Sequence, residues 1–131
     1  MMKLECDQRL PTLNEYIKAV NGSRWAGASL KRKYTEELAW KFKKQAAGKV
    51  FKSHVTIFID FYESNNRRDD DGVMHGMKYI LDGLQEAGII KNDSPKYCHV
   101  LPEVLRSQKK DGNGKIIDYI EISIYESEAV R

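Results

Sequence analysis

Residues 52–62 limit the possible folds most, because their side chains alternate strictly between two sets. Val55, Ile57, Ile59 and Phe61 occupy every second position, and an extended chain places alternate side chains on the same face of a sheet. The stretch is also bounded by polar segments on both sides. The pattern therefore predicts a β-strand with one apolar face.

Other segments follow a helical period or read as further strands. Apolar residues recur every four positions from about Arg24 to Ala47, which predicts a long amphipathic helix. A shorter helix is expected to begin after Thr12, because Thr12 and Glu15 have capping-box spacing. Another helix is expected from about residue 70 to 87, and strands at 4–8, 96–105 and 116–125. Pro102 indicates that its strand is an edge strand or contains a bulge.

These elements predict a single α/β (α+β) domain over residues 1–131, in which a small mixed β-sheet packs against helices. A length of 131 residues suits one domain with one core, and 41% hydrophobic with 31% charged residues is an ordinary globular composition. No apolar run approaches the ~18–20 residues that span a bilayer. We therefore expect a cytoplasmic protein with no membrane partner.

The net charge of +3 hides an uneven distribution along the chain. Residues 1–59 carry a net charge of +7, residues 60–93 carry −4, and residues 94–131 carry none. A basic half of this kind suggests a polyanionic partner, although the basic side chains of the long helix could equally form a solvated face. Those side chains are Lys31, Arg32, Lys33, Lys41, Lys43 and Lys44.

The densest acidic cluster is Asp69-Asp70-Asp71, which follows Arg67-Arg68 at the expected start of a helix. Capping and the helix dipole favour one or two acids there, but three adjacent carboxylates repel one another. On a continuous helix Asp71, His75, Lys78 and Asp82 would share one face. Three glycines would form a separate stripe and predict close packing, namely Gly72, Gly76 and Gly83.

A metal site is one reading of this cluster. Asp69 and Asp71 can point at one spot, and Asp93 joins them if the chain returns past the helix start. Carboxylate oxygens suit Mg²⁺ or Mn²⁺, and Lys78 can stabilise charge on a phosphate. The alternative is a solvated acidic loop with a Lys78–Asp82 pair. An EF-hand is excluded, because Ile80 occupies the twelfth position from Asp69.

Several motifs in order resemble the RusA-type Holliday-junction resolvases, which are small endonucleases often encoded by prophages. The motifs are the stretch from Arg67 to Asp71, the stretch from Ile80 to Gly88, and Asn92-Asp93-Ser94. Residues 10–16, Leu-Pro-Thr-Leu-Asn-Glu-Tyr, also resemble the Pro-rich, Asn-containing start of that family. The resemblance is strongest over residues 67–94.

The resemblance implies a homodimeric, Mg²⁺-dependent endonuclease that nicks four-way DNA junctions symmetrically in recombination and repair. Asp69 and Asp71 match the first two catalytic aspartates of the family, Asp93 matches the third, and Lys78 matches the catalytic lysine, with Asp82 in support. Lys78 lies one turn further along than in the family, and His75 is the rival for its role. Gly72 and Asn92 also depart from the family pattern.

The basic half would then contact DNA backbone, with Arg67, Arg68, Lys109 and Lys110 extending the surface. Trp25 and Tyr16 are candidates for stacking on bases, although packing in the core or in a dimer is the commoner role of such residues. Three alternatives stay open: a prophage protein that binds branched DNA without cleaving it, a related nuclease that prefers flaps or forks, and an interaction protein with a solvated acidic loop.

Overall fold

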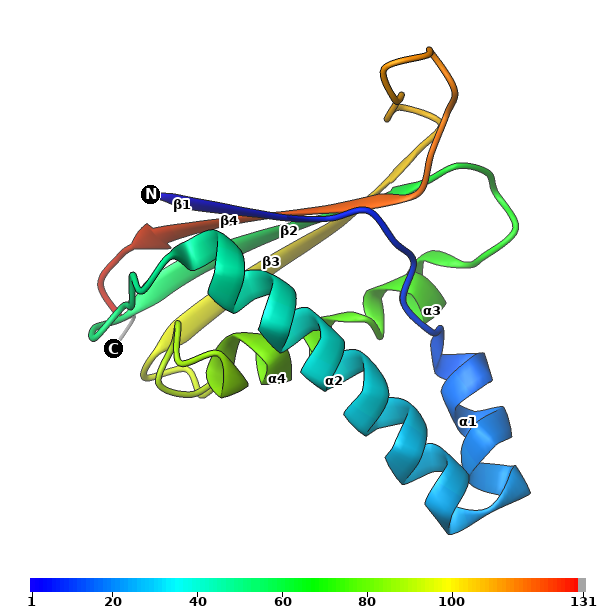
Figure 1. Ribbon diagram of the computed structural model, residues 1–131, viewed down its shortest axis with the longest axis horizontal. Coiled ribbons are helices and arrows are strands. Elements are labelled where there is room, and N and C mark those ends of the chain that lie inside the picture. Colours follow the sequence, from blue (N-terminus) through cyan, green and yellow to red (C-terminus); the bar gives the residue numbers. More distant parts are fainter. Residues whose placement is uncertain (130–131) are drawn as a thin grey trace.

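The computed structural model describes residues 1–129 and contains a four-stranded mixed sheet that packs against helices (Figure 1). This confirms the expected α+β architecture. Among the described residues, no helix combines the length and apolar character needed to cross a membrane. The strands are β1 (Met2–Cys6), β2 (Val55–Glu63), β3 (Cys98–Arg106) and β4 (Tyr119–Glu126), in the order β1-β4-β2-β3. The helices are α1 (Leu13–Gly22), α2 (Arg24–Ala46), α3 (Asp70–Met74) and α4 (Met77–Glu86).

The directions of the strands follow from their connections. β2 and β3 are parallel, because α3 and α4 carry the chain back across the sheet between them, whereas β4 is antiparallel to both of its neighbours. β3 is an edge strand, as Pro102 indicated. The sheet therefore has the loop after β2 and the end of β3 at one end, and the start of β3 at the other.

The core lies between one face of the sheet and the helices α2 and α4. The alternating residues of β2 are buried, as their spacing predicted, and they meet apolar residues of β1 and β4 on the same face. Leu38 and Phe42 of α2 and Ile80 and Leu84 of α4 cover this face and are fully buried. The fully buried aliphatic side chains of the strands are Leu4, Val55, Ile57, Ile59, Ile122 and Ile124.

Glycines permit two close approaches within this core, as the glycine stripe predicted. A Cβ on Gly83 would lie 3.2 Å from Cβ of Leu38, so α4 and α2 pack almost backbone to backbone there. A Cβ on Gly76 would lie 3.1 Å from the ring of Phe61 and 3.2 Å from Leu10. Gly72 makes only ordinary contact distances, with Thr12 at 3.5 Å.

The expected continuous helix over residues 70–87 is wrong, because the chain breaks into α3 and α4 at His75-Gly76. The amide of Gly76 bonds the carbonyl of Val73 at 3.0 Å, which is a tight three-residue turn. Gly76 packs so closely against Leu10 and Phe61 that a Cβ there would make unusually tight contacts with both side chains. The single helical face expected for Asp71, His75, Lys78 and Asp82 is therefore absent from the described structure.

Figure 1 shows that the other face of the sheet is turned away from the helices. This face carries a row of acids. Glu121 lies opposite both Glu5 and Asp60, and Asp60 lies opposite Glu103, so four carboxylates cross all four strands. Only Lys3 forms an ion pair with this row among the described residues, at 2.9 Å from Glu121. Burial, and then the charges of Glu103 and Glu121, raise the pKa of Asp60. Like charges opposite one another destabilise a sheet.

Replacing Asp60 by Asn should therefore stabilise the protein. Because the pKa of Asp60 is raised in the fold, its ionised form costs stability at neutral pH, and that cost disappears as the pH falls through the raised pKa. We expect Asp60→Asn to raise the free energy of unfolding by about 0.5 kcal/mol at pH 7, and by progressively less as the pH falls through the raised pKa of Asp60 toward the ordinary value of about 4. Urea denaturation measures both values. Asp7→Asn, at an exposed position outside the row, is the control, and an equal gain there would contradict the account.

Candidate active site

Two arginines hold the acidic loop that joins β2 to α3. Arg68 is the first: its Nη2 donates to the carbonyl of Leu10 at 2.9 Å, and its Nε lies 3.1 Å from Oε1 of Glu63. Only 10% of the Arg68 side chain and 6% of the Glu63 side chain are exposed. The pair therefore joins the end of β2 to the segment that precedes α1, and Arg68 is engaged inside the protein.

Burial acts on both partners of this pair. It raises the pKa of Glu63, against the opposing charges of Arg68 and Arg9, and it lowers the pKa of Arg68. Each ion is therefore tolerated in the fold only because the other is present.

Arg106, at the end of β3, is the second arginine. Its Nη1 donates to the carbonyl of Asn65 at 3.0 Å, and its Nη2 donates to the carbonyl of Arg68 at 2.5 Å. The same Nη2 lies 2.6 Å from Oδ1 of Asp70. The contacts of Arg68 and Arg106 with the acidic loop form what we call the loop anchor. Asp70 is part of this loop anchor, whereas its neighbours Asp69 and Asp71 are not.

Asp69 and Asp71 line a pocket of about 210 Å³ between the acidic loop and the start of α1. Thr12 is the N-cap of α1, and its hydroxyl accepts from the amide of Glu15 at 3.2 Å, which confirms the expected helix start. The pocket therefore brings together two segments that lie more than fifty residues apart in the sequence. Its lining consists of Thr12, Leu13, Asn14, Glu15, Arg67, Arg68, Asp69, Asp71 and Gly72.

Glu15 is a third carboxylate at this pocket, and sequence reasoning did not propose it. Its spacing from Thr12 already had a local explanation as a helix cap, and the side chain does contact the Thr12 hydroxyl, with Oε1 at 3.2 Å. The signal that could have found it is its place inside the resembling segment 10–16. Together with Asn14, the pocket offers oxygen donors of the kind that Mg²⁺ and Mn²⁺ prefer. In residues 1–129 these side chains are not gathered into a group of three metal ligands.

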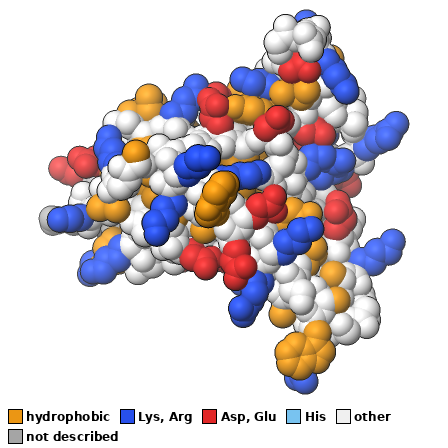
Figure 2. Space-filling model, in the orientation of Figure 1, with side chains coloured by type: hydrophobic (Ala, Val, Ile, Leu, Met, Phe, Trp, Pro, Cys, Tyr) orange, Lys and Arg blue, Asp and Glu red, His pale blue; other side chains and the backbone are white. Residues whose placement is uncertain are grey.

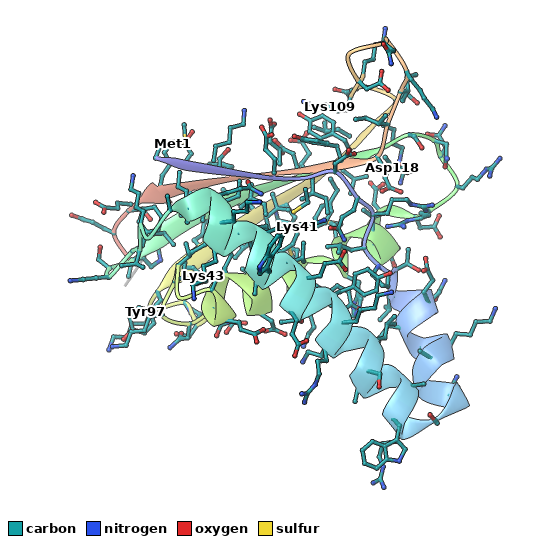
Figure 3. All side chains as sticks on the ribbon, viewed as in Figure 1. Met1, Lys41, Lys43, Tyr97, Lys109 and Asp118 are labelled. Carbon is teal, nitrogen blue, oxygen red and sulfur yellow. The ribbon has the colours of Figure 1, made fainter. Side chains whose placement is uncertain are left out.

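Asp93 lies at the opposite end of the sheet from Asp69 and Asp71. Its carbonyl accepts from the thiol of Cys98, the first residue of β3, whereas the acidic loop is tied to Arg106, the last residue of that strand. Nine residues separate the two ends of β3 by about 26 Å. Figure 3 labels Tyr97 near this far end, well away from α3. One chain therefore does not bring the three aspartates together.

The remaining predicted residues of the site lie on or near α4, outside the pocket lining. His75 packs between Tyr16 and Tyr79, with ring centroids 5.3 and 5.6 Å away, and burial lowers its pKa. Asp82 forms an ion pair with Lys31 of α2 at 3.5 Å. Lys78 is exposed, and within the described chain it forms no ion pair with Asp82.

The predicted DNA-binding residues do not form one continuous surface. Six of them lie on α2, where Figure 3 labels Lys41 and Lys43. Lys109 instead lies over the rings of Tyr62 and Tyr119 on the face that carries the acidic row. The six residues of α2 are Lys31, Arg32, Lys33, Lys41, Lys43 and Lys44, and all but Lys41 are exposed.

The predicted DNA-binding residues also differ in the contacts that they make. Lys41 is half-buried and contacts Gln8 and Glu37. Arg67 is exposed at the pocket rim, and Lys110 pairs with Ile116 in the turn before β4. Of the predicted group, Arg67 is therefore the exposed cation next to the pocket.

Replacing Arg68 tests how much the buried ion pair with Glu63 contributes to the stability of the protein. We expect Arg68→Met to lower the free energy of unfolding by about 3 kcal/mol at pH 7, because Glu63 is left buried without its partner. The loss should shrink toward pH 5, because a proton on Glu63 removes the uncompensated charge. The double variant Glu63→Gln/Arg68→Met is the control. If its loss equalled the sum of the two single losses, the two side chains would be uncoupled.

Comparison with known proteins adds no assignment to this site. No protein-family model matches the chain, and no curated protein matches it in a sequence search. The similarity to the RusA-type resolvases rests on the motifs of residues 10–16 and 67–94 alone.

Proposed function

We propose that the chain is a Mg²⁺-dependent endonuclease that acts on branched DNA, of the RusA type. The observation that carries the proposal is the pocket, because it joins the two separate segments on which the resemblance rests. Asn14 and Glu15 come from the first segment, and Asp69 and Asp71 come from the second. Neither helix capping nor the loop anchor requires Asp71 at that position.

The pocket residues have the chemistry that this reaction needs. Asp69, Asp71 and Glu15 would hold Mg²⁺, with Mn²⁺ as a substitute, and the cation supplies neutralisation of charge at the scissile phosphate. Arg67 at the rim would bind an adjacent phosphate. Arg68 and Arg106 act by holding the loop in place.

Charge also favours an approach of DNA from the helical side of the molecule. The open face of the sheet carries the row of four carboxylates and would repel a polyanion. The helices α1 and α2 carry most of the basic residues of the chain's first half. The pocket opens next to α1, so a strand bound there would avoid the acidic row.

We further propose that the enzyme is a homodimer and that Asp93 acts in the site of the partner subunit. Within one chain, Asp93 and Asp71 lie at opposite ends of β3, which is about 26 Å long. A two-fold axis across the strands reverses the second sheet, so it can place one subunit's Asp93 against the other subunit's pocket. Two symmetric nicks also require two sites related by such an axis.

The first test is cleavage of a synthetic four-way junction in Mg²⁺. We expect Asp71→Asn to reduce the rate by at least ~100-fold, because a metal ligand is lost. Glu126→Gln, which removes one exposed acid from β4, should cleave at the parental rate. If Asp71→Asn matched the parent, the pocket would not be the active site. Flap and fork substrates in the same assay establish which branched structure is preferred.

Mixing two inactive variants tests the role given to Asp93. We expect Asp71→Asn and Asp93→Asn to be inactive alone. An equimolar mixture should regain about a quarter of the parental activity, because about half of its dimers are mixed and one of the two sites in each mixed dimer then holds both native aspartates. If the mixture stayed inactive although mixed dimers formed, both residues would act within one chain. Full activity of Asp93→Asn alone would remove Asp93 from the mechanism.

A second candidate function is binding of branched DNA without cleavage. The separation of Asp93 from the pocket favours it, because two aspartates and Glu15 are then the only acids at the site that one chain's described residues supply. Junction binding without nicking in either Mg²⁺ or Mn²⁺ would support this candidate over the nuclease.

A further inference from the structure

Helix α1 and the first turns of α2 form a two-helix projection, which we call the helical arm (residues 13–34). Figure 1 shows the arm extending away from the sheet, with the turn between its helices at the free end. No residue of α1 is buried. The arm therefore contributes little to the core, so packing in the core does not explain which residues it carries.

The turn of the arm is tightly built. Ser23 ends one helix and begins the other: its amide donates to the carbonyl of Ala19 at 3.2 Å, and its hydroxyl accepts from the amide of Ala26 at 2.9 Å. A Cβ on Gly27 would lie only 2.6 Å from Cγ2 of Val20, so the two helices touch closely there. A side chain at the tip is thus held by a short, close-packed hairpin.

Trp25 lies at this tip and is 75% exposed. Tryptophan is usually well buried, so this exposure at the end of a projecting hairpin is unusual. The guanidinium of Arg24 lies 6.0 Å from the ring centroid. Figure 2 shows hydrophobic surface at the free end of the arm with basic side chains nearby. Trp25 therefore does not pack in the core, which leaves packing in a dimer or stacking on a base as its role.

The arm has the charge of a surface that binds a polyanion. It carries five basic residues and only one acid, a net charge of +4. Packing this surface against its own copy across a two-fold axis would bring +4 against +4, whereas DNA phosphates would neutralise it. An aromatic side chain among basic ones is the usual platform for an unpaired base. The basic residues are Lys18, Arg24, Lys31, Arg32 and Lys33.

We propose that the arm binds DNA at the branch point and that Trp25 stacks on a base exposed there. This rests on the proposed function for its choice of substrate. The ten residues of α1 run about 15 Å from the candidate pocket to the tip. That length corresponds to about 4–5 base pairs, so DNA that runs along α1 with a phosphate in the pocket would reach the tip within half a helical turn.

The two tryptophans of the chain provide matched reporters. Trp40→Phe leaves Trp25 as the only tryptophan, and Trp25→Phe leaves Trp40, which is 66% exposed on the same helix. Each variant is titrated in EDTA with a four-way junction and with a linear duplex. We expect the junction to quench the fluorescence of Trp25 strongly, the duplex to quench it less, and Trp40 to change little with either. Equal changes at both tryptophans would overturn the proposal.

Affinity gives a second readout. Trp25→Ala should weaken junction binding by roughly 10-fold, and Trp40→Ala by less than about 2-fold. Parental affinity for Trp25→Ala would also overturn the proposal. So would a loss of self-association by Trp25→Ala in sedimentation without DNA, because the arm would then belong to a dimer interface.

The result of these binding measurements can be distinguished from the result of the nuclease assay. Binding is measured without metal, so the stacking result stands even if the protein never cleaves. Conversely, a Trp25→Ala variant that binds and cleaves like the parent would refute the stacking role and leave the nuclease intact.

Discussion

The buried ion pair between Arg68 and Glu63 is the contact on which the candidate site depends. It fixes the loop after β2, and through the carbonyl of Leu10 it also fixes the segment before α1. Arg106 completes the anchor from the end of β3 and engages Asp70. The pocket between α1 and the loop is a consequence of these contacts. The adjacent acids thus have different roles, because Asp70 holds the loop while Asp69 and Asp71 line the pocket.

The two faces of the sheet differ in what covers them and in charge. One face is buried under α2 and α4, and the other carries four acids in a row that only Lys3 pairs with among the described residues. The basic arm and the pocket lie on the helical side. The net charge of +3 is therefore the sum of surfaces that attract and repel a polyanion on different sides of one small domain.

Local patterns in the sequence predicted the local structure. Alternation found β2, the four-residue period found α2, and Thr12 with Glu15 found the start of α1. The break at His75-Gly76 lies where Gly76 packs closely against Leu10 and Phe61, which are distant in sequence, and a helical wheel drawn on residues 70–87 contains no such contacts. The place of Asp93 depends on how the chain crosses from β2 to β3, and spacing alone does not contain that information.

The proposed endonuclease activity requires the pocket at the start of α1 to bind a metal ion. Mn²⁺ broadens the NMR signals of nuclei close to where it binds, so a titration locates the site without any substrate. We expect broadening to begin at the amides of the pocket residues Asn14, Glu15, Asp69, Asp71 and Gly72. Broadening centred instead on Asp60 and Glu121 of the open sheet face, with the pocket unaffected, would contradict it.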